Sequence, residues 1–223
     1  MRISIFVVCL LVVCTFIFTR PALAIDGIYV SGNVGAVMLR HSDVKVDELG
    51  TAKIRYDTGY AFTAAVGRKV EYVRFEGELS YRASDMKDEH YSYSDDSISV
   101  SASAGGDVET TSLMLNTYFD IDTGTRFTPF IGGGIGAAYI NAKIWAKGTV
   151  EEDGEVWHES ESADDYDIVF AYQGIVGIAF SLSDDTALDF SYRYFATSDP
   201  EFDGGVEGEY AGHNLMLGLR YSF

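Results

Sequence analysis

The sequence predicts an all-β protein, an eight-stranded antiparallel up-and-down transmembrane β-barrel. Three features lead to this prediction: short segments in which apolar and polar residues alternate, connections that alternate between long and short, and an aromatic residue at the end of the last segment. The 223-residue chain is 47% hydrophobic and 14% aromatic and has 3 prolines. This composition is typical of a folded β protein and excludes an intrinsically disordered one.

The first 24 residues have the layout of a secretory signal peptide. A positive start is followed by an apolar stretch at 5–18 and by a small-x-small sequence that ends at Ala24. A membrane-spanning helix is the alternative, but it needs about 20 apolar residues and Arg20 interrupts this stretch. We therefore expect a signal peptide at 1–24 and an outer-membrane β-barrel domain at 25–223.

Four alternating segments lie in the first half of that domain, at 28–38, 60–70, 73–82 and 111–121. In the third, Phe75 and Leu79 fall on one face of a strand and the charged residues fall on the other. Those charged residues are Arg74, Glu76, Glu78 and Arg82. A half-buried strand of a soluble sandwich alternates in the same way, so the segments alone leave both folds open.

Four more segments follow at 127–139, 168–180, 188–195 and 214–223. Phe190 alternates with Asp189 and Arg193, and Leu217 alternates with Arg220, so charge again falls on one face only. The segment at 127–139 carries glycines on its polar face, at Gly132, Gly134 and Gly136. The total is eight predicted strands.

The connections between these strands distinguish the two folds. Long polar connections lie at about 40–58, 83–109, 140–166 and 197–211, and short ones lie near 69–72, 122–124 and 183–185. Long and short connections alternate strictly, so they collect at opposite ends of the strands. This is the layout of a membrane barrel with short periplasmic turns and four long external loops, and a soluble sandwich has no reason to adopt it.

The apolar faces supply the predicted contacts with lipid. We expect Tyr60, Leu79, Phe190, Leu217 and Phe223 to face lipid. Aromatic residues of the same faces cluster at the strand ends, where membrane interfaces favour them. The external ring would hold Tyr60, Tyr81, Tyr139, Phe170 and Tyr194; the periplasmic ring would hold Phe119, Phe127, Phe180, Tyr221 and Phe223.

The polar faces supply the predicted barrel interior. It would receive a lumen charge cluster of Arg74, Glu76, Glu78, Arg82, Asp189, Arg193 and Arg220, with Tyr29, Asn116, Tyr118, Phe130 and Phe195 beside it. Eight strands enclose only enough room for side chains. We therefore interpret the cluster as a paired structural core, with an ion pathway or gate as the alternative.

The formal net charge of −18 constrains the partners. It excludes nucleic acid, because phosphates would be repelled. The acidic residues concentrate in the last three long connections, where runs such as 151–153 lack the spaced ligand pattern of a calcium loop. We interpret them as solvated acidic loops, with Ca²⁺ or Mg²⁺ binding as the alternative, and we expect no cofactor.

The residues at 75–81, 128–136 and 217–223 carry a resemblance that covers the whole predicted domain. The sequence resembles the small eight-stranded outer-membrane β-barrels of Gram-negative bacteria, which include the OmpA membrane domain, OmpX-like proteins and porin-family surface antigens. In that family a C-terminal aromatic residue, with another two positions before it, looks like the signal that the outer-membrane assembly machinery recognises. Here Phe223 and Tyr221 hold those positions.

The resemblance implies the cell outer membrane as the location, and contacts with outer-membrane lipid and lipopolysaccharide. We expect a monomeric closed scaffold whose acidic loops meet a host or surface ligand, with a narrow solute or ion channel as the alternative. A lipid A-modifying enzyme is less favoured. The stretches 41–43 and 158–160 combine His with Ser and a carboxylate, but they lie in predicted loops that would not hold a nucleophile firmly. We therefore expect no enzymatic activity and no catalytic residue.

Overall fold

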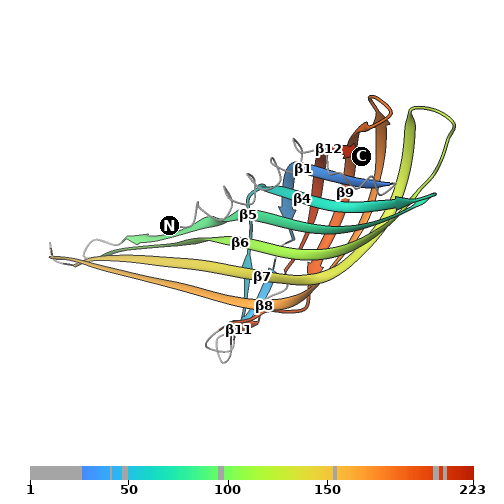
Figure 1. Cartoon of the computed structure of the whole chain (residues 1–223). Helices are drawn as coiled ribbons and strands as arrows, with labels where there is room; N and C mark the ends of the chain where they lie inside the picture. Colours follow the sequence, from blue (N-terminus) through green and yellow to red (C-terminus); the bar gives the residue numbers. More distant parts are fainter. Residues whose placement is uncertain are drawn as a thin grey trace.

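The computed structural model describes residues 27–40, 42–46, 50–94, 98–152, 155–202, 206–207 and 210–223, so the predicted signal peptide lies outside the described residues. Eight antiparallel strands form a closed ring in the order β1, β12, β9, β8, β7, β6, β5, β4 (Figure 1). Their bounds are β1 (Ile28–Leu39), β4 (Gly59–Val70), β5 (Val73–Ser94), β6 (Ile98–Asp120), β7 (Phe127–Glu152), β8 (Glu155–Ser181), β9 (Thr186–Thr197) and β12 (Ala211–Ser222). The predicted eight-stranded barrel is confirmed.

Pairing between the first and last strands closes the barrel. The β1–β12 register runs from Tyr29↔Ser222 to Leu39↔Gly212, and β1 pairs along its other edge with β4. Inside a bilayer no water is present to satisfy a free strand edge, so only a closed ring can cross it. The described residues contain no helix that is long and apolar enough to cross a membrane.

The barrel wall is apolar on the outside and polar on the inside. The five residues predicted to face lipid, Tyr60, Leu79, Phe190, Leu217 and Phe223, are 39–52% exposed. Ring pairs also form at the predicted ends of the strands, such as Phe127 with Phe180 at a centroid distance of 5.0 Å. The charged members of the alternation are buried instead. This arrangement is the reverse of a soluble protein and is the one a lipid environment requires.

The prediction that residues 83–109 and 140–166 form loops was wrong. β5 and β6 stay paired through Asp85↔Asp107 to Ser94↔Ser99, and β7 and β8 stay paired through Lys143↔Asp164 to Glu152↔Glu155. Apolar and polar residues still alternate in parts of these segments, at 98–108 and 140–150, so the signal of a strand was present among the many acidic and small polar residues. The backbone continues its hydrogen-bond ladder, and the four strands extend well beyond the barrel (Figure 1).

The other two long connections also contain strands. The first holds β2 (Ser42–Val46) and β3 (Gly50–Ile54), and the fourth holds β10 (Glu201–Phe202) and β11 (Val206–Glu207). These form a separate sheet in the order β10, β11, β2, β3, with Glu207 opposite Lys45. The external end of the barrel therefore carries two sheets instead of four loops.

The extension of β5, β6, β7 and β8 has two outer strands. β9 pairs with β8 only as far as Ala171↔Thr197, so the residues of β8 before this point have no β9 neighbour. There the carboxylates of Asp165 and Asp167 accept hydrogen bonds from the backbone N–H groups of Tyr166 and Ile168 at 2.8 and 2.7 Å. Such local bonds satisfy donors that a further strand would otherwise take up, which protects a free edge.

Substitution of an inward-facing glycine tests how tightly the barrel interior is packed. A Cβ at Gly136 would collide with the Leu113 carbonyl, whereas one at lipid-facing Gly174 would meet no atom within 4 Å. We expect Gly136→Ala to destabilise the barrel by about 1–3 kcal/mol through overpacking. The temperature at which the SDS-resistant folded band converts to the unfolded band should fall for Gly136→Ala and stay constant for Gly174→Ala. Equal temperatures for the two variants would contradict the described interior.

Candidate functional site

The candidate site is the charged interior of the barrel. All seven residues of the predicted lumen charge cluster, Arg74, Glu76, Glu78, Arg82, Asp189, Arg193 and Arg220, are 0–9% exposed. β5 contributes four of them, because every second residue of a strand points to the same face. Their neighbours Tyr29, Asn116, Tyr118, Phe130 and Phe195 are buried as well.

One ion pair crosses the whole interior. Arg193 on β9 contacts Glu78 on β5, and in the ring these two strands lie four places apart in either direction, directly opposite each other. Gln173 on β8 donates a further hydrogen bond to Glu78 at 3.2 Å. The side chains are 5% and 0% exposed, so the pair is well shielded from solvent. The barrel interior is therefore bridged across its full width.

Three further ion pairs lie nearer the short turns. Asp120 accepts Arg74 at 2.9 Å and Lys69 at 2.8 Å, and Asp189 accepts Arg220 at 3.2 Å. Our sequence reasoning missed Asp120. The signal was present, because Asp120 has the same strand parity as Asn116 and Tyr118 and therefore points inward with them.

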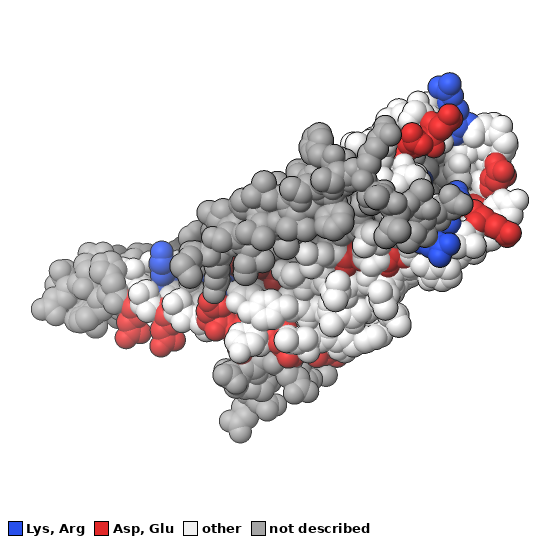
Figure 2. All heavy atoms as spheres, viewed as in Figure 1, with Lys and Arg blue, Asp and Glu red and all other residues white. Residues whose placement is uncertain are grey.

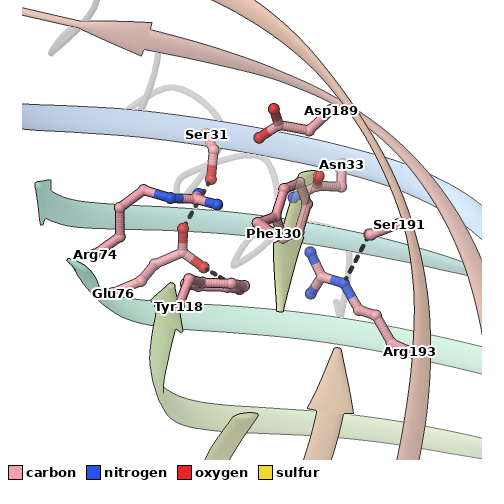
Figure 3. A pocket seen from close by; sticks show the side chains of 9 residues that line it. All are labelled: Ser31, Asn33, Arg74, Glu76, Tyr118, Phe130, Asp189, Ser191 and Arg193. Atoms are coloured by element: carbon pink, nitrogen blue, oxygen red, sulfur yellow. Dashed lines mark hydrogen bonds between the residues drawn. The ribbon is translucent and has the colours of Figure 1, made fainter. Parts of the chain in front are cut away.

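Glu76 is held by neutral donors. The hydroxyls of Tyr29 and Tyr118 each donate to its carboxylate at 3.0 Å, and Ser31 and Asn116 donate at 3.4 Å. Figure 3 shows the contacts of Ser31 and Tyr118. No ion pair reaches Glu76 among the residues that the structure describes. Several hydrogen bonds to one carboxylate stabilise its charge in the way a cation would.

Arg82 lies farther from the short turns and has no carboxylate partner among the described residues. Its Nη1 donates to the hydroxyls of Ser80 at 2.7 Å and Ser112 at 3.2 Å. Its guanidinium carbon lies 3.9 Å from the centre of the Phe195 ring. Among the described residues, Arg82 is thus the interior arginine whose direct contacts are hydroxyls and an aromatic face instead of a carboxylate.

Side chains fill the interior. The cavity beside Arg74, Glu76 and Arg193 measures about 10 Å³, which is at the lower limit of the space that one water molecule needs (Figure 3). Toward the external end an apolar cluster occupies the lumen, including Met86, Val108, Met114, Ile140, Phe195 and Tyr210. Tyr56 packs against this cluster, and burial raises its pKa to about 12, so its phenol is neutral at physiological pH.

The residues considered for catalysis are not brought together. Ser42 and Asp43 lie in β2, and Glu159 and Ser160 lie in β8, so the prediction that both stretches are loops was wrong. His41 and the side chain of His158 lie outside the described residues. His213 contacts the Tyr192 hydroxyl at 2.7 Å. Within the described ranges, no group of three or more His, Cys, Asp or Glu could hold a metal ion.

The C-terminal aromatic pair lies at the end of the barrel that carries the short turns. The rings of Tyr221 and Phe223 are 5.1 Å apart, and both side chains are 39% exposed on the lipid-facing row. The Phe223 backbone N–H donates to the carbonyl of Ile28 at 2.9 Å. The pair is thus anchored at the β1–β12 closure and accessible from outside.

Residues 8–223 match the family described as outer membrane protein beta-barrel domain. The chain is 25% identical to "Outer membrane protein PagN" of Salmonella typhimurium over 233 residues, covering 92% of this chain and 94% of that protein. It is 31% identical to "Putative adhesin RC1281" of Rickettsia conorii over 121 residues, covering 49% of this chain. The match spans 47% of the length of the Rickettsia protein.

Solved structures give the same fold. The crystal structure of Neisserial surface protein A superposes with a TM-score of 0.50 at 16% identity, covering 89% of this chain and 98% of that chain. At this level of identity the likeness concerns the fold alone.

The ion pair that crosses the lumen can be tested against one on the surface. Glu78→Gln leaves the buried Arg193 without a carboxylate, and we expect it to cost about 3–5 kcal/mol of folding free energy. The control is Asp107→Asn, which removes the half-exposed pair with Lys143 and should cost at most about 1 kcal/mol. Equilibrium unfolding by urea in lipid vesicles measures both. Similar costs for the two variants would contradict a buried bridge.

Proposed function

The chain belongs to the family of outer membrane protein β-barrel domains, and from this premise we propose that it is a closed scaffold that presents an acidic external surface. The filled interior is the observation that carries the proposal. Arg193 and Glu78 bridge the lumen, and the apolar cluster around Met114 and Phe195 occupies the region above them. An ion crossing this barrel would have to break a buried ion pair and pass through an apolar constriction.

The long strands β5, β6, β7 and β8 give the scaffold its external surface. In the view of Figure 2, acidic side chains gather along the lower edge of the extension. Exposed acids of the described external region are Asp57, Asp85, Glu159, Glu161, Asp164 and Asp199. A surface of one sign attracts a ligand of the other sign, so we propose a cationic surface or protein as the partner. The partial match to the Rickettsia protein, whose name describes an adhesin, supports this role.

The remaining parts of the proposal concern export and assembly. We propose that residues 1–24 direct export and that Tyr221 and Phe223 are the residues that the assembly machinery recognises. The exposed position of both rings on the outer row at the turn end supports this assignment, because a recognition signal must be reachable from outside the barrel.

Conductance separates the closed scaffold from a channel. The purified protein, refolded and inserted into a planar lipid bilayer, should give no steady single-channel current, because the lumen is bridged and filled. The Glu78→Gln variant, with the bridge removed, tests whether any current depends on the lumen charges. Steady current through the unaltered protein that changes in this variant would overturn the closed scaffold in favour of a narrow channel.

Binding of a cationic probe tests the acidic surface. Oligolysine should bind the refolded protein in zwitterionic micelles, and added salt should weaken the binding. The variant Glu159→Gln/Glu161→Gln/Asp164→Asn should lose most of the affinity. The control replaces three exposed acids at the turn end, Asp122, Asp184 and Asp185, by Asn.

The control should bind nearly as well as the unaltered protein. At the turn end the exposed bases Arg68, Lys69 and Arg126 offset the acids, so this end attracts a cation weakly. Equal losses in the two triple variants would contradict a binding surface on the extension.

A further inference from the structure

The lipid-facing wall of β4, β5 and β6 has an open groove in the half of the barrel nearer the short turns. Val66, Phe75 and Leu115 line it and are 55–70% exposed. Gly77 is the register partner of both Val66 and Leu115, so its missing side chain leaves the space between them. The groove measures about 660 Å³, within the range of about 300–1,000 Å³ that is typical of small-molecule sites. We propose that it binds one anionic phospholipid, with an acyl chain over Gly77 and the phosphate at Arg68.

The packing of the described protein does not require a glycine at position 77. A Cβ there would meet no atom within 4 Å, whereas a Cβ at the inward-facing Gly132 would collide with the ring of Tyr118. Glycine weakens the interior of a strand, and where it occurs it often marks the close approach of a ligand. The open side of Gly77 faces lipid, so an acyl chain is the group that can approach it.

Arg68 provides a positive charge beside the groove. It is exposed on the outer face of β4 and is the register partner of Phe75. Among the residues that the structure describes, no carboxylate forms an ion pair with Arg68, whereas its neighbour Lys69 contacts Asp120 at 2.8 Å. Glu71 lies farther from the groove, in the turn after β4. A guanidinium in this position favours a phosphate, to which it can donate two N–H groups at once.

Aromatic rings place Arg68 at the surface of the membrane. Tyr72 and Phe119 are each 50% exposed, and their rings lie 6.4 Å apart. Phe119 is the register partner of Val73, two residues before Phe75 on β5. Aromatic residues collect at the headgroup level of a bilayer. Arg68 therefore lies close to the headgroups, and the apolar groove runs from there toward the bilayer centre. A phospholipid presents a phosphate and an acyl chain in the same order.

The position of the groove also determines which leaflet supplies the lipid. Barrels of this kind have their short turns in the periplasm, so the groove opens to the periplasmic leaflet. Thr117 on β6 adds an exposed hydroxyl beside Phe75 that can donate to an ester or phosphate oxygen. An anionic headgroup is favoured over a zwitterionic one, because it carries no cation of its own to compete with Arg68 for the phosphate.

Native mass spectrometry of the refolded protein in a neutral detergent measures the binding of the first lipid. The probe is phosphatidylglycerol, and diacylglycerol and glycerol phosphate represent its two halves. We expect one phosphatidylglycerol to bind per barrel and either half to bind at least about tenfold more weakly. Equal binding of glycerol phosphate would exclude a contribution of the groove, and equal binding of diacylglycerol would exclude one of Arg68. Either result would overturn the proposal.

Two variants separate the two parts of the site. Arg68→Gln removes the charge, and Gly77→Leu fills the groove from a position where a Cβ meets no atom. Each should weaken the binding of phosphatidylglycerol by about tenfold. The matched controls are Arg126→Gln, which removes another exposed cation at the turn end, and Gly174→Leu, which fills another open position on the outer face. Both controls should keep the affinity.

The four variants also give the outcomes that would contradict the site. Equal affinities in all four would show that lipid coats the wall without a preferred position. A loss in only one of Arg68→Gln and Gly77→Leu would reject a site that holds headgroup and chain together. Losses of the same size in the controls would assign the effect to the barrel as a whole.

Photolabelling locates the lipid on the unaltered protein and does not depend on the folding of a variant. Phosphatidylglycerol that carries a diazirine on one acyl chain is mixed into phosphatidylcholine vesicles with the refolded protein. After illumination, the label should be concentrated in residues 62–79 and 113–117, which flank the groove. Labelling spread evenly around the lipid-facing wall would overturn the proposal.

Discussion

The ion pair between Arg193 on β9 and Glu78 on β5 is the contact on which the rest of the interior depends. It joins strands on opposite sides of the ring, so it fixes the lumen across its width. Other polar groups connect to it in sequence: Gln173 donates to Glu78 and to Asn116, and Asn116 in turn donates to Glu76. Four strands, β5, β6, β8 and β9, are thereby tied through one network, and its members keep these partners only while the ring stays closed. Such a network specifies a single arrangement more strongly than separate pairs would.

The barrel meets lipid along its wall and water beyond the bilayer, and these two environments explain its remaining features. Within the bilayer the backbone must close on itself and the outer face must be apolar, so long polar side chains have only the narrow interior to occupy. Glycines such as Gly134, where a Cβ would collide with the side-chain amide of Asn116, provide the space they need. Outside the bilayer these restrictions end. The strands β5, β6, β7 and β8 continue there as a paired extension and carry the acidic surface away from the membrane. A closed interior and an extended exterior are what a scaffold for surface contacts requires.

Period-two alternation was sufficient to predict the strands inside the bilayer and the inward position of Arg74, Glu78 and Arg193, because lipid forces apolar and polar residues to opposite faces. The prediction of loops at 83–109 and 140–166 was wrong because their many acidic and small polar residues outweighed the alternation that 98–108 and 140–150 retain. The pairing inside the barrel could not be predicted. Which arginine meets which carboxylate depends on the stagger between strands, and this is why Glu76 meets tyrosines and Arg82 meets serines. Asp120 is a different case, since its parity was readable from the sequence and was overlooked.

The central claim is that a buried ion pair bridges and stabilises a filled barrel, and a double-mutant cycle tests it most directly. The unfolding free energy in lipid vesicles would be measured for the unaltered protein, Glu78→Gln, Arg193→Gln and the double variant. If the two side chains act as one buried pair, the double variant costs far less than the two single variants added together, with a coupling energy of about 1.5–3 kcal/mol. Additive costs, with a coupling energy below about 0.5 kcal/mol, would show that the two side chains do not depend on each other and would contradict the account.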